Sequence, residues 1–152
     1  MNQSQHFVLF NLDEQQYALH LPVVERVLRI VEVSPLPQAP EIVLGMINIQ
    51  GRILPVINLR RRLGLPEHEI HLSNQLIMVR TSHRSVALVV DFVSGVVERS
   101  ENEIVPEKRI LPGMEYIRGV TLFQDGVILI HDLDQFLSLG EEKALEEAMK
   151  KT

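Results

Sequence analysis

The stretch "GMINIQGRILPVINLRRRL", residues Gly45–Leu63, predicts a β-hairpin followed by one helical turn. The runs on both sides of its polar tip at Gln50 are rich in valine, isoleucine and leucine, which favour strands on a pleated surface. After the hairpin, Leu59 and Leu63 stand four residues apart and Gly64 follows, which is typical of a helical turn that ends at a glycine. This stretch therefore indicates a β-rich fold with a short helical connection.

The same pattern returns later in the chain, which indicates an internal duplication. Gly45 aligns with Gly119 and Gln50 with Gln124, both 74 positions later. A second block aligns 69 positions later, with Tyr17 on Val86, and it includes the pairs Phe7 with Leu76, Ala18 with Ala87 and Val27 with Val96. Two ungapped blocks in the same order favour duplication over chance. The repeats span roughly 7–63 and 76–137.

Each repeat offers four or five short strands, and an open sheet of that size leaves unpaired edges. Closing the sheet into a small barrel removes those edges. We therefore expect a mainly β chain with two similar barrels around one shared core, as lobes of a single domain over 1–152. Pro55 predicts an edge strand or a bulge. A C-terminal helix is expected over 141–151, with an apolar stripe that comprises Ala144, Leu145, Ala148 and Met149.

Composition narrows the classes of function. The chain of 152 residues has a formal net charge of −5 and only 5% aromatic residues. An oligonucleotide-binding barrel needs a basic face and stacking rings, so a nucleic-acid partner is not expected. The absence of cysteine excludes disulfides and thiol catalysis. No signal peptide or membrane-spanning run is visible, and we expect a soluble cytoplasmic protein without membrane insertion.

Few residues suggest chemistry. His68 and His71 have a loose metal-ligand spacing but lack the HExxH pattern, so a solvated loop is favoured over a metal site or small enzyme. His20 and His131 fall in strand patterns and are expected to be hydrogen-bonded or half-exposed. Asp91 stands in an apolar run, which predicts a strand end or bonds to backbone amides. We expect no catalytic residue, metal or cofactor.

Arginines cluster in one place in this acidic chain. Arg60, Arg61 and Arg62 follow the hairpin, and Arg52 lies within it. They favour a solvated helical turn, with a docking face for an acidic partner as the alternative.

Four segments carry a resemblance to a known family: "YALHLPVVERVL", "LPQAPEIVLGMINIQGRILPVINLRRRLG", "VALVVDFVSGVV" and "YIRGVTLFQDGVILIHDLDQFL". Over essentially its full length the chain resembles the CheW-like chemotaxis adaptor family. The second segment is the most specific, because the family pattern is a proline-rich approach, G-V-I-N-L-R-G and then P-V-I-D-L-R.

The resemblance implies two five-stranded Src-homology-3-like barrels related by a pseudo-twofold axis, without catalysis. Proteins of this family bridge the cytoplasmic tip of a chemoreceptor (a methyl-accepting chemotaxis protein) to the regulatory domain of the histidine kinase CheA. Recruitment to receptor arrays at the inner face of the membrane is implied as well. The implied receptor-groove residues are Val24, Arg26, Gly45, Gln50, Leu76 and Ile77. The implied kinase contact lies around Ile53, Leu54 and Val56.

The chain departs from the family pattern at two positions. The family usually has glutamate where Arg26 stands and arginine where Gln50 stands. We hypothesise that Arg26 donates a hydrogen bond to the Gln50 amide oxygen. Because charged pairs in a recognition groove set specificity, the change suggests a partner unlike the general chemoreceptor. The alternative function is thus a CheW-like domain that binds another regulator, for pili, gliding or gene expression.

Overall fold

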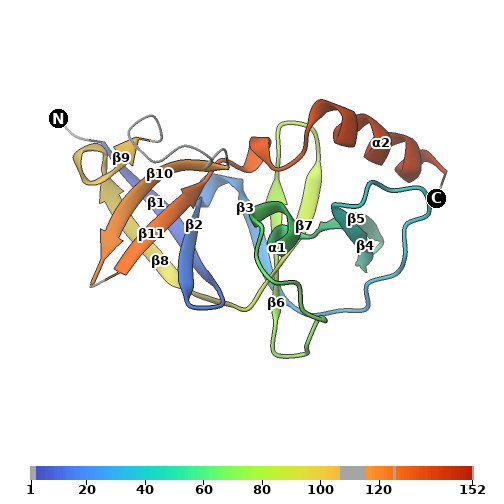
Figure 1. Cartoon of the computed structure of the whole chain (residues 1–152), viewed down its shortest axis with the longest axis horizontal. Coiled ribbons are helices and arrows are strands. Elements are labelled where there is room, and N and C mark those ends of the chain that lie inside the picture. The colour runs from blue at the N-terminus through green and yellow to red at the C-terminus, as the bar shows by residue number, and fades with distance from the viewer. Residues whose placement is uncertain (1–2, 107–115, 125, 152) are drawn as a thin grey trace.

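Two antiparallel-rich sheets lie side by side in the part of the chain that the computed structural model describes, which is residues 3–106, 116–124 and 126–151 (Figure 1). The first sheet has the strand order β8-β1-β2-β11-β10-β9 and the second β3-β6-β7-β5-β4. The first sheet comprises β1 (Ser4–Leu12), β2 (Gln15–His20), β8 (Phe92–Ser100), β9 (Val105–Pro106), β10 (Ile117–Phe123) and β11 (Gly126–His131). The second comprises β3 (Val24–Arg29), β4 (Val43–Ile49), β5 (Arg52–Ile57), β6 (Gln75–Arg80) and β7 (Ser85–Val90).

The strand registers repeat as the aligned sequence blocks do. Phe7 pairs with His20 in β1–β2, and Leu76 pairs with Val89 in β6–β7, 69 positions later. Gly45 pairs with Val56 in β4–β5, and the same register returns 74 positions later in β10–β11. Both of these hairpins also have a register shift at the same place, two residues before the aligned glycine. Of the second repeat, residues 107–115 and 125 lie outside the described residues.

The sheets do not coincide with the sequence repeats, because each repeat divides its strands between them. The first two strands of each repeat join the sheet that holds the later strands of the other repeat: β1 and β2 join β8 to β11, and β6 and β7 join β3 to β5. β3 of the first repeat pairs with β6, and β8 of the second repeat pairs with β1. The run Tyr17–Leu28, which reads as continuous in the sequence, is interrupted by a 3₁₀ turn at Leu21–Val23. Pro22 in that turn has no N–H for a strand ladder, and the chain leaves one sheet there and enters the other.

The core has one shared part and one part within each lobe. The shared cluster joins Phe10 and Leu19 of the first sheet to Ile77 and Leu88 of the second. A second cluster lies within the sheet of β3–β7, and a third lies around Phe7 and the strands next to it. The expected shared core between two lobes is therefore present, and both lobes bury apolar side chains against it.

Pro55 does not mark an edge strand, because β5 lies between β7 and β4. Its partner across β4–β5 is Met46, whose N–H and C=O both bond to Ser34 instead, at 2.8 Å each. The pairing of β5 with β7 covers only Val56 and Ile57. Pro55 therefore lies at a position where neither neighbouring strand, β4 or β7, needs a backbone N–H donor from β5. The Ser34–Met46 bridge also joins the segment after β3 to β4.

Two helices complete the fold. α1 (Leu59–Leu63) begins after Asn58, whose side chain accepts from the Arg61 N–H, and ends at Gly64 with φ of 72°. α2 (Leu139–Lys150) begins two residues before the predicted range, because Ser138 and Glu141 form a capping box. Leu145 and Ala148 of α2 are buried against Leu36 and neighbouring residues of the β4 region. Figure 1 shows α2 lying alongside β4 and β5.

Candidate partner-binding site

The residues implied for a receptor groove lie mainly on β3 and β6, which are hydrogen-bonded neighbours. Val24 is half-buried at the start of β3, and Arg26 is exposed two residues later. Leu76 and Ile77, on β6, are fully buried, each in a different core cluster. Their side chains contact the core and present no surface to a partner in this structure.

The residues implied for a kinase contact divide in the same way. On β5, Leu54 and Val56 are 2% and 0% exposed, whereas Ile53 is 41% exposed. This alternation follows from the period of two along a strand. Ile53 is therefore the residue of this set that a partner can touch directly, and the other two hold the strand in the barrel.

Gly45 has a structural reason to be glycine. A Cβ atom at this position would lie 2.3 Å from the Ser34 carbonyl oxygen and 2.9 Å from a Val33 methyl group. Its counterpart in the repeat, Gly119, would meet an Ile104 methyl group at 2.8 Å. The two aligned glycines thus allow the preceding segment to approach the strand closely in both lobes. Gly45 is buried and influences any partner surface through backbone position.

The predicted contact between Arg26 and Gln50 is absent, since no hydrogen bond joins these two described residues. An acid–base contact between the same two segments exists nearby: Arg52 Nη1 donates to Glu25 Oε2 at 3.3 Å. Arg52 Nη2 also donates to Ser85 Oγ at 2.9 Å, and the Ser85 hydroxyl donates to Glu25. The Ser85 hydrogen bond, followed by Arg52, lowers the pKa of the Glu25 carboxyl.

Glu25, Arg52 and Ser85 form a hydrogen-bonded triad, which the sequence did not reveal because of a β-bulge. The register of β3 against β6 shifts between Val24 and Arg26, so Glu25 is the extra residue. A bulge re-aims side chains on its strand. The repeat offers no second copy of the triad, because the positions aligned with Glu25 and Arg52 are Ser94 and Gly126. The triad therefore distinguishes one lobe from the other.

The tip of the hairpin has a defined backbone. Gln50 and Gly51 have φ of 54° and 89°, which matches the positive angles at both central positions of a type I′ turn. Asn48 Oδ1 accepts from the Gly51 N–H at 2.9 Å. Gln124, the aligned residue, also has φ of 54°. The residue before the second central position thus has the same positive φ in both repeats, which agrees with the duplication.

The arginine triplet is only partly a solvated turn, because Arg61 is exposed whereas Arg60 and Arg62 are bound within the protein. Arg60 is 9% exposed, and its guanidinium donates to Asp13 Oδ1 at 3.0 Å, to Asp91 Oδ1 at 2.8 Å and to the Pro66 carbonyl at 3.0 Å. Arg62 donates to Glu141 of α2 at 2.5 Å. Asp91 lies between β7 and β8 and accepts from the Asp13 N–H at 2.7 Å. The two alternatives predicted for Asp91, a strand end and a backbone-amide partner, are both confirmed.

His131 differs from its prediction as a hydrogen-bonded or half-exposed histidine. It is 3% exposed, and neither ring nitrogen has a hydrogen-bond partner among the described residues. The rings of Phe10, Tyr17 and Phe136 surround it at centroid distances of 5.8, 4.7 and 5.1 Å. Burial lowers its pKa to about 3, so the imidazole is neutral. The alignment of the repeats could have predicted this burial, because His131 aligns with Ile57, an apolar strand residue that is fully buried.

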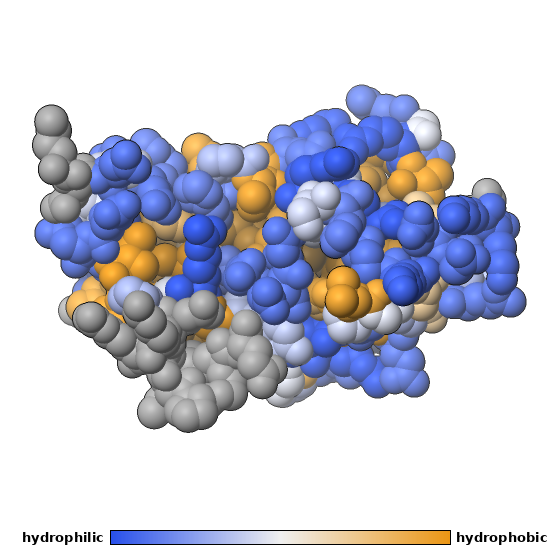
Figure 2. All heavy atoms as spheres, turned by 90° about the horizontal axis from the view of Figure 1, so that it is seen from above, coloured by the Kyte–Doolittle hydropathy of each residue, from blue (hydrophilic) through white to orange (hydrophobic). Residues whose placement is uncertain are grey.

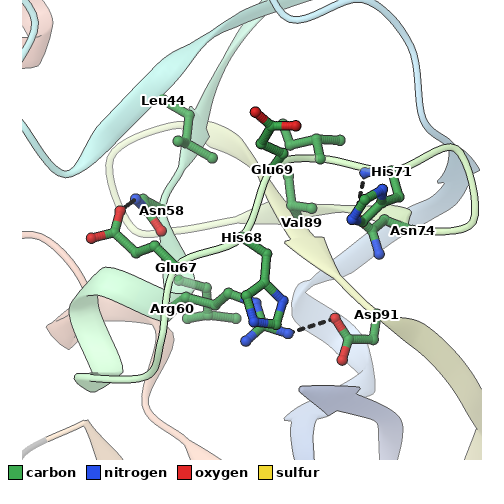
Figure 3. Close-up of a pocket in the computed structure, with 12 residues that line it drawn as sticks. Leu44, Asn58, Arg60, Glu67, His68, Glu69, His71, Asn74, Val89 and Asp91 are labelled. Carbon is green, nitrogen blue, oxygen red and sulfur yellow. Dashed lines mark hydrogen bonds and ion pairs between the residues drawn. The ribbon is translucent and has the colours of Figure 1, made fainter. Parts of the chain in front are cut away.

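A small pocket lies under the loop that follows α1, and Figure 3 shows its lining. Its volume is about 70 Å³, and His68, His71, Asp91 and Arg60 contribute to its wall. In the described residues no group of three or more His, Asp or Glu side chains is placed to hold a metal ion. The two histidines thus lie near one pocket without forming a ligand set.

Exposed apolar side chains were absent from the sequence-based candidates. Figure 2 shows apolar patches between largely polar regions of one face. Val27 on β3 and Val96 on β8 are 40% and 55% exposed, and they occupy aligned positions of the two repeats. Next to them, Val24 and Val93 are half-buried against the shared core cluster. The first strand after each crossing between the sheets, β3 and β8, thus carries an exposed valine at the aligned position.

Comparison with known proteins supports one family. The CheW-like domain family matches residues 6–141. The chemotaxis protein CheW of Rhizobium meliloti is 28% identical over 145 residues, which is 94% of each chain. The chemotaxis protein CheW of Thermotoga maritima is 36% identical over 95 residues, 62% of each chain.

Among solved structures, the scaffolding protein TtCheW of Thermoanaerobacter tengcongensis is similar, with a TM-score of 0.82 and 28% identity. The match covers 91% of this chain and 96% of that one. The expected fold, mainly β with two Src-homology-3-like halves and a C-terminal helix, is confirmed by this likeness. None of the helices in the described ranges combines the length and apolar character needed to cross a membrane. The chain belongs to the CheW-like domain family, whose members are non-enzymatic scaffolds of chemotaxis.

Proposed function

We propose that this protein couples the cytoplasmic tips of chemoreceptors to the regulatory domain of the histidine kinase CheA. The observation that carries the proposal is the family match over residues 6–141, together with a two-lobed fold like that of a CheW scaffold. A scaffold needs separate surfaces for its partners, and two lobes around a shared core offer them. The proposed location is the cytoplasm, at receptor arrays on the inner face of the membrane.

The proposed receptor surface lies beside the junction of the lobes. Val24 and Val27 of β3 and Val96 of β8 supply its apolar side chains. Arg26 is adjacent to Val27 in β3 and lies on the other face of that edge strand. Matching exposed valines on the two strands suit the apolar face of a receptor helix. Arg26 adds a charge that selects among receptors. The other implied residues support the backbone from within, namely Gly45, Leu76 and Ile77.

The proposed kinase surface is the β4–β5 hairpin. Ile53 offers the exposed apolar side chain, and Leu54 and Val56 anchor the strand behind it. Gln50, at the tip, is exposed and held in a defined turn. A rigid hairpin loses little conformational freedom on binding, which favours affinity.

Co-sedimentation with a receptor cytoplasmic fragment and CheA tests the proposal. Val96→Glu is expected to abolish receptor binding and to leave kinase binding unchanged, and Ile53→Asp is expected to do the reverse. Leu72→Asp is the matched control, because Leu72 is 91% exposed and lies in the segment between α1 and β6, which belongs to neither proposed surface. Retention of neither partner by the unaltered protein at micromolar concentration would refute the coupling function.

A second candidate is a CheW-like domain that binds another regulator, in pathways for pili, gliding or gene expression. The specific observation is that Arg26 and Gln50 replace the acid and the base of the family pattern. An acid–base contact between the same two strands is formed instead by Glu25 and Arg52. Binding of CheA without any chemoreceptor fragment, in the same co-sedimentation, would favour this candidate.

A further inference from the structure

The chain covers one of its own pockets with an acidic, extended segment. Residues 65–74 run over the pocket that α1, β4 and β7 enclose (Figure 3). Asn58 Nδ2 donates to Glu67 Oε1 at 2.6 Å, and Arg60 Nη1 donates to the Pro66 carbonyl at 3.0 Å. A carboxylate and a carbonyl of the segment thus meet donors on the side of the helical turn.

A second pocket stands at the place that the duplication relates to the first. Its volume is about 80 Å³, close to the 70 Å³ of the covered pocket. Five lining positions correspond through the sequence alignment of the repeats. They are Leu44 with Arg118, Asn58 with Asp132, Leu59 with Leu133, Arg60 with Asp134, and Val89 with His20.

The chain takes a different course after each of the two pockets. After α1 the chain forms the covering loop and then returns as β6. After the turn Leu133–Gln135, which corresponds to α1, the chain enters α2 instead. That helix packs with Leu145 and Ala148 against Leu36, in the other lobe. In the described part of the chain, the second pocket therefore has no counterpart of the covering loop.

The second pocket has an arginine where the first has an apolar side chain, and a further arginine that has no counterpart in the lining of the first. Arg118 on β10 replaces Leu44, and Arg80, at the end of β6, corresponds to Asn11. Both arginines are exposed, and neither forms a hydrogen bond or ion pair with a described residue. His20 lies close enough to Arg118 for the arginine charge to lower the pKa of the imidazole, after the larger effect of burial.

The remaining lining suits a peptide backbone. Leu19, Val23 and Leu133 give the pocket an apolar floor. Asp132 and Asp134 lie on the side of the turn, and Asp134 Oδ1 already accepts from the Ser82 N–H at 2.8 Å. The donors of the second pocket, Arg80 and Arg118, thus lie on its strand side. An anionic segment would bind that side, whereas Glu67 binds the helical-turn side of the first pocket.

We propose that this pocket, formed by His20, Arg80 and Arg118 over its apolar floor, binds an extended acidic segment of a partner protein. The segment takes the place that residues 65–74 take in the related pocket. Its carboxylates pair with the two arginines, and one aliphatic side chain contacts the floor. Guanidinium groups without an internal partner form strong charge-assisted bonds to carboxylates. This site adjoins the proposed receptor surface, because Val23 of its floor directly precedes Val24, and it shares no residue with the proposed kinase surface.

Fluorescence anisotropy with a labelled peptide tests the proposal. The probe is Leu-Pro-Glu-Glu-Glu-Ile-Glu-Leu-Ser-Asn, which is segment 65–74 with both histidines changed to glutamate. The unaltered protein is expected to bind this peptide, with affinity that falls as salt rises. Arg118→Leu and Arg80→Asn, which copy the residues of the first repeat, should each weaken binding about tenfold, as expected for loss of one charge-assisted hydrogen bond.

The matched control is Arg29→Asn, which removes the charge of another exposed arginine without a described partner, on β3 outside this pocket. It should leave the affinity within about twofold of the unaltered protein. The proposal is overturned if Arg29→Asn weakens binding as much as the pocket variants do. It is also overturned if the unaltered protein does not bind the acidic peptide, or binds its lysine-substituted version or a single-stranded DNA 12-mer equally well. Thermal unfolding of each variant confirms that folding is retained.

Discussion

Arg52 reaches across its barrel to Glu25, with 3.3 Å between Nη1 and Oε2, and both side chains share the Ser85 hydroxyl. Arg52 follows the hairpin tip by one residue, and Glu25 occupies the bulge of β3. These hydrogen bonds therefore connect the β4–β5 hairpin, which we propose binds the kinase, to β3, which we propose binds the receptor. Neither Arg26 nor Gln50 takes part in this connection.

A double-mutant cycle of Glu25→Gln and Arg52→Met is expected to give a coupling energy of about 0.5–1 kcal/mol in urea unfolding, since both side chains are partly exposed. Because the folded-state pKa of Glu25 is lowered, this stabilisation is present above its ordinary value of 4.5 and is lost as the pH falls through the lowered value. The control cycle of Arg26→Met with Gln50→Met should be additive. Coupling in the control cycle, with none between Glu25 and Arg52, would contradict the observed triad.

Arg60→Met is expected to lower the free energy of unfolding by about 2 kcal/mol, because it leaves Asp13 and Asp91 without their shared cation. The figure is lower than for a fully buried pair, since both carboxylates are partly exposed. Arg61→Met is the control in the same helix. Its side chain is 47% exposed, and a change within about 0.5 kcal/mol is expected. Equal effects of the two substitutions in urea unfolding would refute the distinct role of Arg60.

His131→Leu is expected to match or exceed the stability of the unaltered protein at pH 7.5, since it removes two buried nitrogens without partners. The unfolded state binds a proton below about pH 6.5, whereas folded His131, with a pKa of about 3, does not. The stability due to neutral His131 is therefore present above 6.5 and lost as the pH falls toward 3. At pH 5.5 the variant should gain a further advantage of about 1.4 kcal/mol in urea unfolding.

The control for this pH effect is Ile57→Val at the aligned position of the first repeat, which involves no titratable group and should show the same stability difference from the unaltered protein at both pH values. A His131→Leu difference that does not change with pH would mean that the imidazole titrates normally in the folded protein.

Leu145→Ala is expected to lower stability by about 3 kcal/mol, because Leu145 is fully buried under α2 and its loss leaves a cavity. Leu139→Ala, in the same helix but 78% exposed, should change stability by less than about 0.5 kcal/mol. Thermal and urea unfolding compare the two. Similar small effects would show that α2 is not docked on the lobe in solution.

Gln50→Gly is expected to raise stability by about 0.5 kcal/mol, because φ of 54° strains a side-chain residue more than glycine, and the greater freedom of unfolded glycine offsets part of the gain. Gln124→Gly should act alike, since its φ is the same. Gly51→Ala, at φ of 89°, should act in the opposite direction. Urea unfolding measures all three, and loss of stability in Gln50→Gly would contradict the turn geometry.

Much of the fold was predictable because its signals are local. The hairpin 45–63, the turn ending at Gly64 and the aligned glycines follow from residue preferences and spacing. The candidate site was less predictable. Leu76 and Ile77 lie in a run buried on both faces, so the sequence does not separate core residues from surface residues there. Val27 and Val96 were visible as an aligned pair, but their exposure depends on which strands lie at the sheet edges.

By itself the sequence determined the β class, the duplicated order of strands and turns, and the family, because these depend on residue preferences, period and motif within each segment. The tertiary structure decided that the β1–β2 and β6–β7 hairpins each join the sheet of the other repeat. It also decided that Glu25 meets Arg52, that Arg60 is buried between Asp13 and Asp91, and that, within the described residues, a loop covers one of two related pockets and not the other. Each of these outcomes depends on contacts between distant segments, whose distances and burial exist only once the chain has folded.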